Sequence, residues 1–170
     1  MEILKQVEKE IRILGYYQLI GGILGMGTIA VSSIVIERIL FLVIMALPFL
    51  LSIYAGTQCL RNKSNQLFIS KINQALQVIS FSLGGFGFSY CAGVYLGIGI
   101  ETTNDFIFKF NFGLSTMNFT INSLSETSFI LTNLVAFYLV YRIGQYESFL
   151  DEIKEKKEKL DIEDHLISNE

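Results

Sequence analysis

The 170-residue chain has no tryptophan, one proline, one histidine and two cysteines. Two cysteines do not make a disulfide framework, so we interpret Cys59 and Cys91 as thiols that behave as small apolar side chains. Metal sites need clustered histidine, cysteine, aspartate or glutamate, and the sequence has no such cluster at ligand spacing. We therefore expect neither a metal nor a cofactor.

Charge is also scarce: charged residues make up 17% of the chain, against about a quarter in typical soluble domains. None occurs from Ile39 to Leu60 or from Ile72 to Ile100. A helix of about 20 apolar residues is long enough to cross a bilayer. The pattern therefore predicts a polytopic membrane protein whose main partner is the lipid bilayer.

The central parts of the apolar segments contain no acid, histidine, lysine or arginine. Such groups usually mark proton relays and coupled transport within membranes. No serine or cysteine has an evident neighbouring base, which nucleophilic catalysis requires. We expect no catalytic residues, no enzymatic activity and no nucleic-acid partner.

The apolar runs predict an all-α membrane protein, a four-transmembrane-helix bundle formed by residues 1–146. The helices are expected at 13–35, 39–60, 75–100 and 128–146, with a long loop at 101–127. A signal peptide is the alternative for the first segment, but its apolar run exceeds the usual length of roughly 7–15 residues.

Lysine and arginine predict the orientation. Eleven of them lie at the N-terminus, between the second and third segments, or toward the C-terminus from Arg142 onward, and two lie on the other side. We expect a multi-pass protein of the cell inner membrane with both termini in the cytoplasm. Residues 147–170 form a charged helical tail, which is either solvated or a docking site for a protein partner.

Small residues at four-residue spacing predict close helix packing. We expect the first and third segments to pack within one subunit, and a homo-oligomer interface is the alternative. Pro48 should kink the second helix, as a static bend rather than a hinge. The packing residues are Gly21, Gly25, Gly85, Ser89, Gly93 and Gly97.

Polar side chains also occur inside the apolar segments, at Gln18, Gln77 and Asn133. Interhelical hydrogen bonding is their default role. The alternative is a polar path through the bundle.

The phenylalanines at 106–112 fall on every second position, which is the side-chain period of a strand. We predict a short β-hairpin in the outer loop with its turn at 113–116; a helix is the competing interpretation. A lone hairpin is marginal in water, so its apolar face needs cover from its own helices, from lipid or from neighbouring subunits. That face is Phe106, Phe108, Phe110, Phe112, Met117, Phe119 and Ile121.

The function expected from these features is that of a small non-enzymatic integral membrane protein acting as a scaffold, accessory or interaction subunit. The alternatives are an oligomeric channel or pore, and a small transporter of an uncharged solute. The sequence names no substrate.

Overall fold

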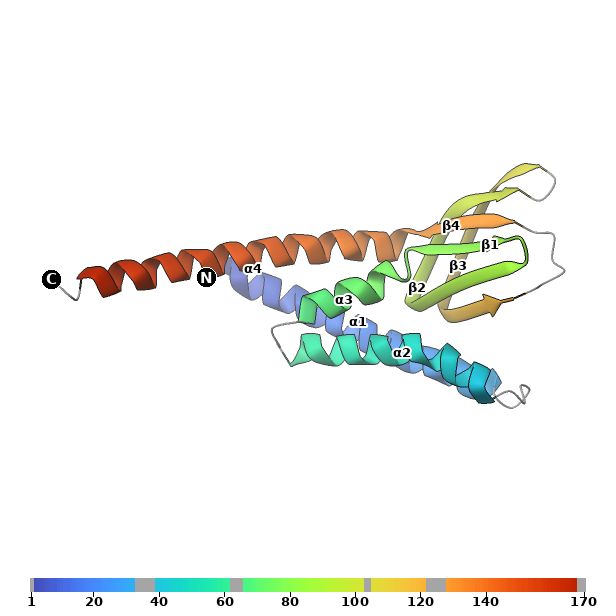
Figure 1. Cartoon of the computed structure of the whole chain (residues 1–170), viewed down its shortest axis with the longest axis horizontal. Helices are drawn as coiled ribbons and strands as arrows, with labels where there is room; N and C mark the ends of the chain where they lie inside the picture. Colours follow the sequence, from blue (N-terminus) through green and yellow to red (C-terminus); the bar gives the residue numbers. More distant parts are fainter. Residues whose placement is uncertain (1, 33–38, 62–65, 103–104, 122–127, 168–170) are drawn as a thin grey trace.

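A computed structural model of the chain describes residues 2–32, 39–61, 66–102, 105–121 and 128–167. The fold is mixed α/β. A curled antiparallel sheet lies at one end of the long axis of the molecule, and the helices run along that axis (Figure 1). The elements are α1 (Glu2–Ser32), α2 (Ile39–Leu60), α3 (Gln66–Ala75), β1 (Ile79–Leu83), β2 (Phe86–Thr102), β3 (Phe106–Thr120), β4 (Phe129–Asn133) and α4 (Leu134–Ile167).

The predicted four-helix bundle is wrong. Residues 75–100 contain the end of α3, β1 and most of β2, and residues 128–146 begin as β4 before continuing as α4. Two described helices are long and apolar enough to cross a membrane, within Glu2–Val31 and Leu40–Leu60. These are the first two predicted segments, although residues 33–35 of the first lie outside the described residues.

A glycine pair explains why the third segment folds as strands. Gly84 and Gly85 have φ of 57° and 84°, a left-handed conformation that suits a two-residue hairpin turn. They join β1 to β2, so that Leu83 pairs with Phe86 and Phe81 with Phe88. A helix through this point would need right-handed backbone at both glycines.

The long strand β2 organises the sheet. Its first residues pair with β1, its last residues pair with β4, and β1 pairs with β4, so these three strands close on one another. β3 pairs with β2 along nearly its whole length and forms the outer edge. The sheet therefore curls, as Figure 1 shows.

Residues 106–120 do form a strand, but the predicted hairpin within them is wrong. Phe110 pairs with Ile98 and Phe112 with Leu96, both on β2. The predicted turn at 113–116 lies inside β3. The strand partner comes from the preceding segment because β2, with 17 residues, matches the 15 residues of β3 in length. A longer ladder satisfies more main-chain groups than a short hairpin would.

The two faces of the sheet differ in polarity. Residues opposite one another in a ladder share a face, and the inner face surrounds a hollow of about 350 Å³ whose polar lining includes Ser80, Ser82, Ser89, Tyr95, Asn111, Asn118 and Thr120. The outer face of β2 and β3 is apolar and exposed, at Ile98, Ile100, Phe106, Phe108, Phe110, Phe112 and Leu114. Phe81, Phe88, Phe129 and Leu131 also line this hollow, so the inside of the sheet is mixed but more polar than the outside.

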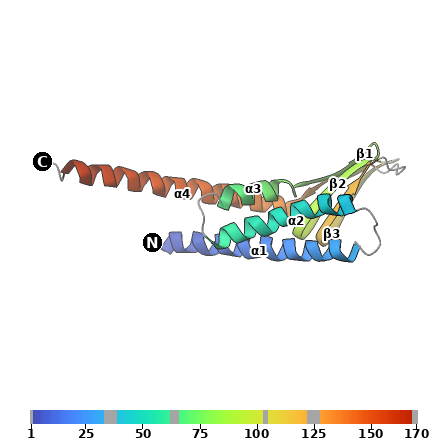
Figure 2. The same cartoon turned by 60° about the horizontal axis from the view of Figure 1, so that its bottom comes forward.

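The helices α1 and α2 form an antiparallel pair that lies against the sheet (Figure 2). Close approach between them needs small residues, because a Cβ on Gly56 would lie 2.6 Å from the carbonyl oxygen of Gly15. α3 packs between α2 and α4, and α4 extends away from the sheet beyond the other helices.

The contact between α1 and the sheet is equally tight. A Cβ on Gly21 would lie 2.5 Å from the main-chain nitrogen of Gly93 and 2.6 Å from the carbonyl carbon of Ala92. Gly93 has φ of 115° and lies under the ring of Tyr17. Helix and strand therefore meet backbone to backbone at this point.

This contact predicts opposite effects for the same substitution at two positions of α1. Gly21→Ala should destabilise the fold by about 1–2 kcal/mol, because overpacking against main chain outweighs the gain in helix propensity. Gly27→Ala is the control, since its Cβ would meet nothing within 4 Å, and it should stabilise by up to about 1 kcal/mol. Thermal unfolding of both variants in one detergent measures the difference, and equal midpoints would contradict the contact.

Candidate functional site

Polar side chains support the stretch of β2 between its pairings with β1 and β4. A bulge lies between Cys91 and Val94, and there side chains replace strand partners. The amide of Ala92 donates to Gln77 Oε1 at 2.8 Å, and that of Gly93 donates to Ser115 Oγ at 2.9 Å.

Two further caps complete this support. The amide of Val94 donates to the Tyr17 hydroxyl at 3.1 Å, and that of Leu96 donates to Asn133 Oδ1 at 3.3 Å. The four capping residues come from α1, from β3, from β4 and from the turn after α3. The bend in β2 therefore depends on residues far apart in the chain.

A second group of polar residues continues from this support into the helices. The Tyr90 hydroxyl lies 2.6 Å from the carbonyl oxygen of Pro48 and 3.0 Å from Asn73 Oδ1. Asn73 Nδ2 donates to Ser52 Oγ at 3.2 Å, and Ser52 Oγ donates to the carbonyl of Gln18 at 2.9 Å. A connected network thus joins α1, α2, α3 and β2 beneath the sheet.

The residues predicted to form a polar path are all fully buried. Gln77 donates to the carbonyl oxygen of Asn73, so Gln18 and Gln77 belong to the same network. Asn133 is the last residue of β4 and directly precedes α4, and its Oδ1 also accepts from the amide of Val135 at 3.2 Å as a helix cap. The hydrogen bonds of these three residues are made to main-chain groups and to neighbouring side chains.

The predicted packing residues serve several different contacts. Gly21 and Gly93 meet directly, as a helix on a strand, and a Cβ on Gly25 would overlap the ring of Phe49. Gly85 forms the β1–β2 turn. Ser89 and Gly97 lie on the inner face of β2.

The predicted apolar surface lies on the outside of β3. Phe106, Phe108, Phe110 and Phe112 are exposed, with Phe108 at 92%. Met117 is partly buried and packs against the cluster of Phe49, Tyr90 and Ala92. Phe119 forms an edge contact with the ring of Phe86, and Ile121 follows the strand.

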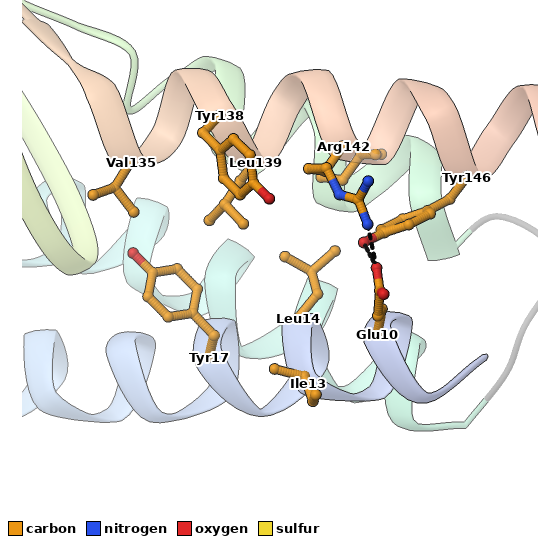
Figure 3. Close-up of a pocket in the computed structure, with 10 residues that line it drawn as sticks. Glu10, Ile13, Leu14, Tyr17, Val135, Tyr138, Leu139, Arg142 and Tyr146 are labelled. Carbon is orange, nitrogen blue, oxygen red and sulfur yellow. Dashed lines mark hydrogen bonds and ion pairs between the residues drawn. The ribbon is translucent and has the colours of Figure 1, made fainter. Parts of the chain in front are cut away.

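A groove of about 450 Å³ lies between α1 and α4 (Figure 3). Both helices contribute side chains at spacings of three and four residues, which places them on one face of each helix. Most of the residues that line the groove are aliphatic or aromatic: Ile13, Leu14, Tyr17, Val135, Tyr138, Leu139 and Ile143.

A charged cluster closes the end of the groove that is farther from the sheet (Figure 3). Arg142 and the Tyr146 hydroxyl both donate to the carboxylate of Glu10, and the Arg142 guanidinium lies 5.0 Å from the centre of the Tyr146 ring. Burial raises the pKa of the Tyr146 hydroxyl, and its bond to Glu10 raises it further. The sequence offered no signal for this cluster, because Glu10 lies 132 and 136 residues before Arg142 and Tyr146.

The arrangement of the groove suits an elongated apolar group with a polar end. The acyl chain of a lipid would lie along the aliphatic and aromatic walls, and the headgroup of that lipid would meet Glu10, Arg142 and Tyr146. Within the described part of the chain, no three histidine, cysteine, aspartate or glutamate side chains are placed to hold a metal.

No family model, curated protein or solved structure matches this chain.

The support of β2 predicts a large effect for a single buried amide. Gln77→Leu should destabilise the fold by about 1–3 kcal/mol, because the amide of Ala92 would remain buried without an acceptor. Gln145→Leu is the control, since Gln145 is an exposed glutamine on α4. Chemical unfolding followed by circular dichroism measures both variants, and a similar effect of the two changes would argue against the capping role.

Proposed function

We propose that this chain is a non-enzymatic integral membrane protein in which α1, α2 and the outer face of the sheet contact lipid. The observation that carries this proposal is the distribution of polarity. Exposed apolar side chains cover α1, α2 and the outer face of β2 and β3, while most of the polar side chains of the sheet line its inner hollow, together with a few apolar ones. Apolar-out and polar-in alternation is typical of strands that face lipid.

The placement of charges supports the same orientation. Residues 13–32 of α1 carry no charge and span about 30 Å, which matches the apolar thickness of a bilayer. Glu10 and Arg142 lie near one end of this region. Glu101, Asp105 and Lys109 lie at the tip of the β2–β3 pair. Charges are therefore found where the uncharged part of α1 begins and at the tip of a strand pair, and not within the uncharged part of α1.

If α1 and α2 each cross the membrane once, the chain before α1 and the chain after α2 lie on the same side of the membrane. The excess of lysine and arginine near the N-terminus, after α2 and along α4 favours the cytoplasmic side. There α4 continues as an exposed helix, with ion pairs between Glu152 and Lys156 and between Glu155 and Lys159. This helix is a suitable docking element for a soluble protein, which supports a scaffold or accessory role.

The channel alternative receives less support. The part of the sheet that closes on itself has three strands, whereas a barrel of about eight strands has an interior only just wide enough to be filled by side chains. Tyr95 and Leu131 line its hollow and are buried. A conduit through one subunit is therefore not favoured.

Membrane integration can be tested with two leucines of similar exposure. Leu47 in α2 is 57% exposed, and Leu160 in α4 is 59% exposed. Leu47→Lys should reduce the fraction that resists alkaline carbonate extraction, because a lysine in the middle of a membrane helix costs about 2.5–3.5 kcal/mol. Leu160→Lys should leave that fraction unchanged. A wild-type protein released by carbonate would overturn the proposal.

A second function is favoured by the groove between α1 and α4. Its apolar walls lie beside the membrane-crossing part of α1, and its charged end lies where α1 becomes polar. Within a bilayer, an apolar groove of this kind would be filled by a lipid chain. We propose that it binds a phospholipid whose headgroup meets Arg142 and Glu10.

Filling the groove should displace this lipid. Val135→Trp places a larger side chain in the lining, so native mass spectrometry with added palmitoyl-oleoyl phosphatidylethanolamine should show less bound lipid than for the wild type. Phe137→Trp is the control, because Phe137 is exposed on the same helix and does not line the groove. Equal lipid retention by both variants would rule out this site.

A further inference from the structure

The sheet has one long free edge, the outer edge of β3. β1 pairs with both β2 and β4, and β4 pairs with both β1 and β2. β3 pairs with β2 alone. Every second residue of β3 therefore directs its amide and carbonyl away from the sheet.

The unpaired stretch of β2 between β1 and β4 differs from the free edge of β3. The free stretch of β2 is capped by Gln77, Ser115, Tyr17 and Asn133. Across the described residues, no side chain forms a hydrogen bond with the main chain of β3 at its outer edge. The edge of β3 is left with its hydrogen-bonding groups available.

Part of this edge lies beside the helices. Residues 114–120 face α1 and the start of α2 across a groove lined by Thr28, Ile29, Phe41, Leu42 and Met45. Residues 106–113 do not line this groove, and their phenylalanines are the most exposed side chains of the outer face. This part of the edge is accessible to another strand.

Lipid makes such an edge unfavourable. A main-chain group left unpaired in hydrocarbon costs several kcal/mol, so strands in membranes need partners on both sides. In water the same edge would be hydrated or would recruit another strand. Because the outer face of the sheet is apolar and suits lipid, the free edge of β3 needs a partner strand more than the edge of a sheet in water does.

We infer that residues 106–113 of two copies pair as antiparallel strands across a two-fold axis, so that the two sheets become one. This inference rests on the membrane placement proposed above. It commits to a second copy because the structure shows one free edge, and a two-fold axis pairs that edge with itself and leaves none open.

Charge is compatible with this pairing. Lys109 is the one charged residue from 106 to 120, and it forms an ion pair with Glu101 and lies 4.9 Å from the centre of the Phe129 ring in its own subunit. The positive charge of Lys109 is therefore balanced by Glu101 within each copy, so that two β3 strands can pair without repulsion between their lysines. The paired outer faces would present one continuous row of phenylalanines to lipid.

A cysteine scan of β3 tests the pairing. Each position from 106 to 112 is changed to cysteine in turn, the protein is reconstituted in dioleoyl phosphatidylcholine, and disulfides are formed with copper phenanthroline. Because antiparallel strands related by a two-fold axis bring a residue opposite its own copy only near the axis, dimer formation should show a single maximum along the strand. The wild type, whose Cys59 and Cys91 are buried, is the blank.

Ile98→Cys is the matched control. Ile98 lies on the same outer face but on β2, so its copy would be three strand spacings away, about 14 Å, beyond the reach of a disulfide. The mass of the wild-type protein in nanodiscs should be twice that of the 19.2 kDa chain.

Two results separate this inference from the membrane proposal. A carbonate-resistant protein with the mass of one chain, and with no position exceeding Ile98→Cys, would overturn the pairing and leave the membrane placement standing. A protein released by carbonate that still shows the maximum would overturn the membrane placement and support the pairing. Disulfides spread evenly from 106 to 112 would also overturn it, since they indicate random collision.

Discussion

The bend of β2 between β1 and β4 is the constraint on which the rest of the structure depends. A strand that changes partners leaves amides unpaired, and burying them without acceptors is costly. Here Gln77, Ser115, Tyr17 and Asn133 provide those acceptors. Because these residues belong to different elements, satisfying the bend also fixes the positions of α1, β3 and β4.

Close approach of backbones makes this capping possible. Tyr17 reaches Val94 because Gly21 lets α1 lie directly on Ala92 and Gly93. Small residues perform the same role between α1 and α2, at Gly15 and Gly56. Packing by small residues and buried polar contacts suits a protein surrounded by lipid, where the hydrophobic effect contributes little between helices.

The apolar outer face and the polar inner face lead to a common functional picture. The helix pair and the sheet form a body with lipid-compatible sides, a groove suited to an acyl chain, and a free strand edge suited to a second copy. The exposed part of α4 extends from this body with its own ion pairs. Binding and assembly are the roles that we propose for these features, in a scaffold or accessory protein.

Several interpretations of the sequence failed because one pattern fits two structures. Gly85, Ser89, Gly93 and Gly97 recur every four residues, a spacing that suits one face of a helix and equally two periods of a strand. The pair Gly84–Gly85 was the local signal for a hairpin turn. Uncharged length alone favoured a helix, since β-strands that face lipid give a much weaker signal.

The sequence by itself determined the scarcity of charge, the two apolar helices at the N-terminal end and the strand period of the phenylalanines, because composition and periodicity are local properties. Only the tertiary structure decided that β2 is the partner of those phenylalanines, that Glu10 meets Arg142, and that Gln77 and Asn133 support the same strand. The phenylalanines pair with residues 4 to 16 positions away, whereas Gln77, Asn133 and Glu10 reach partners 15, 37 and 132 positions away. No local pattern encodes which hydrogen-bonding group will be satisfied by which side chain.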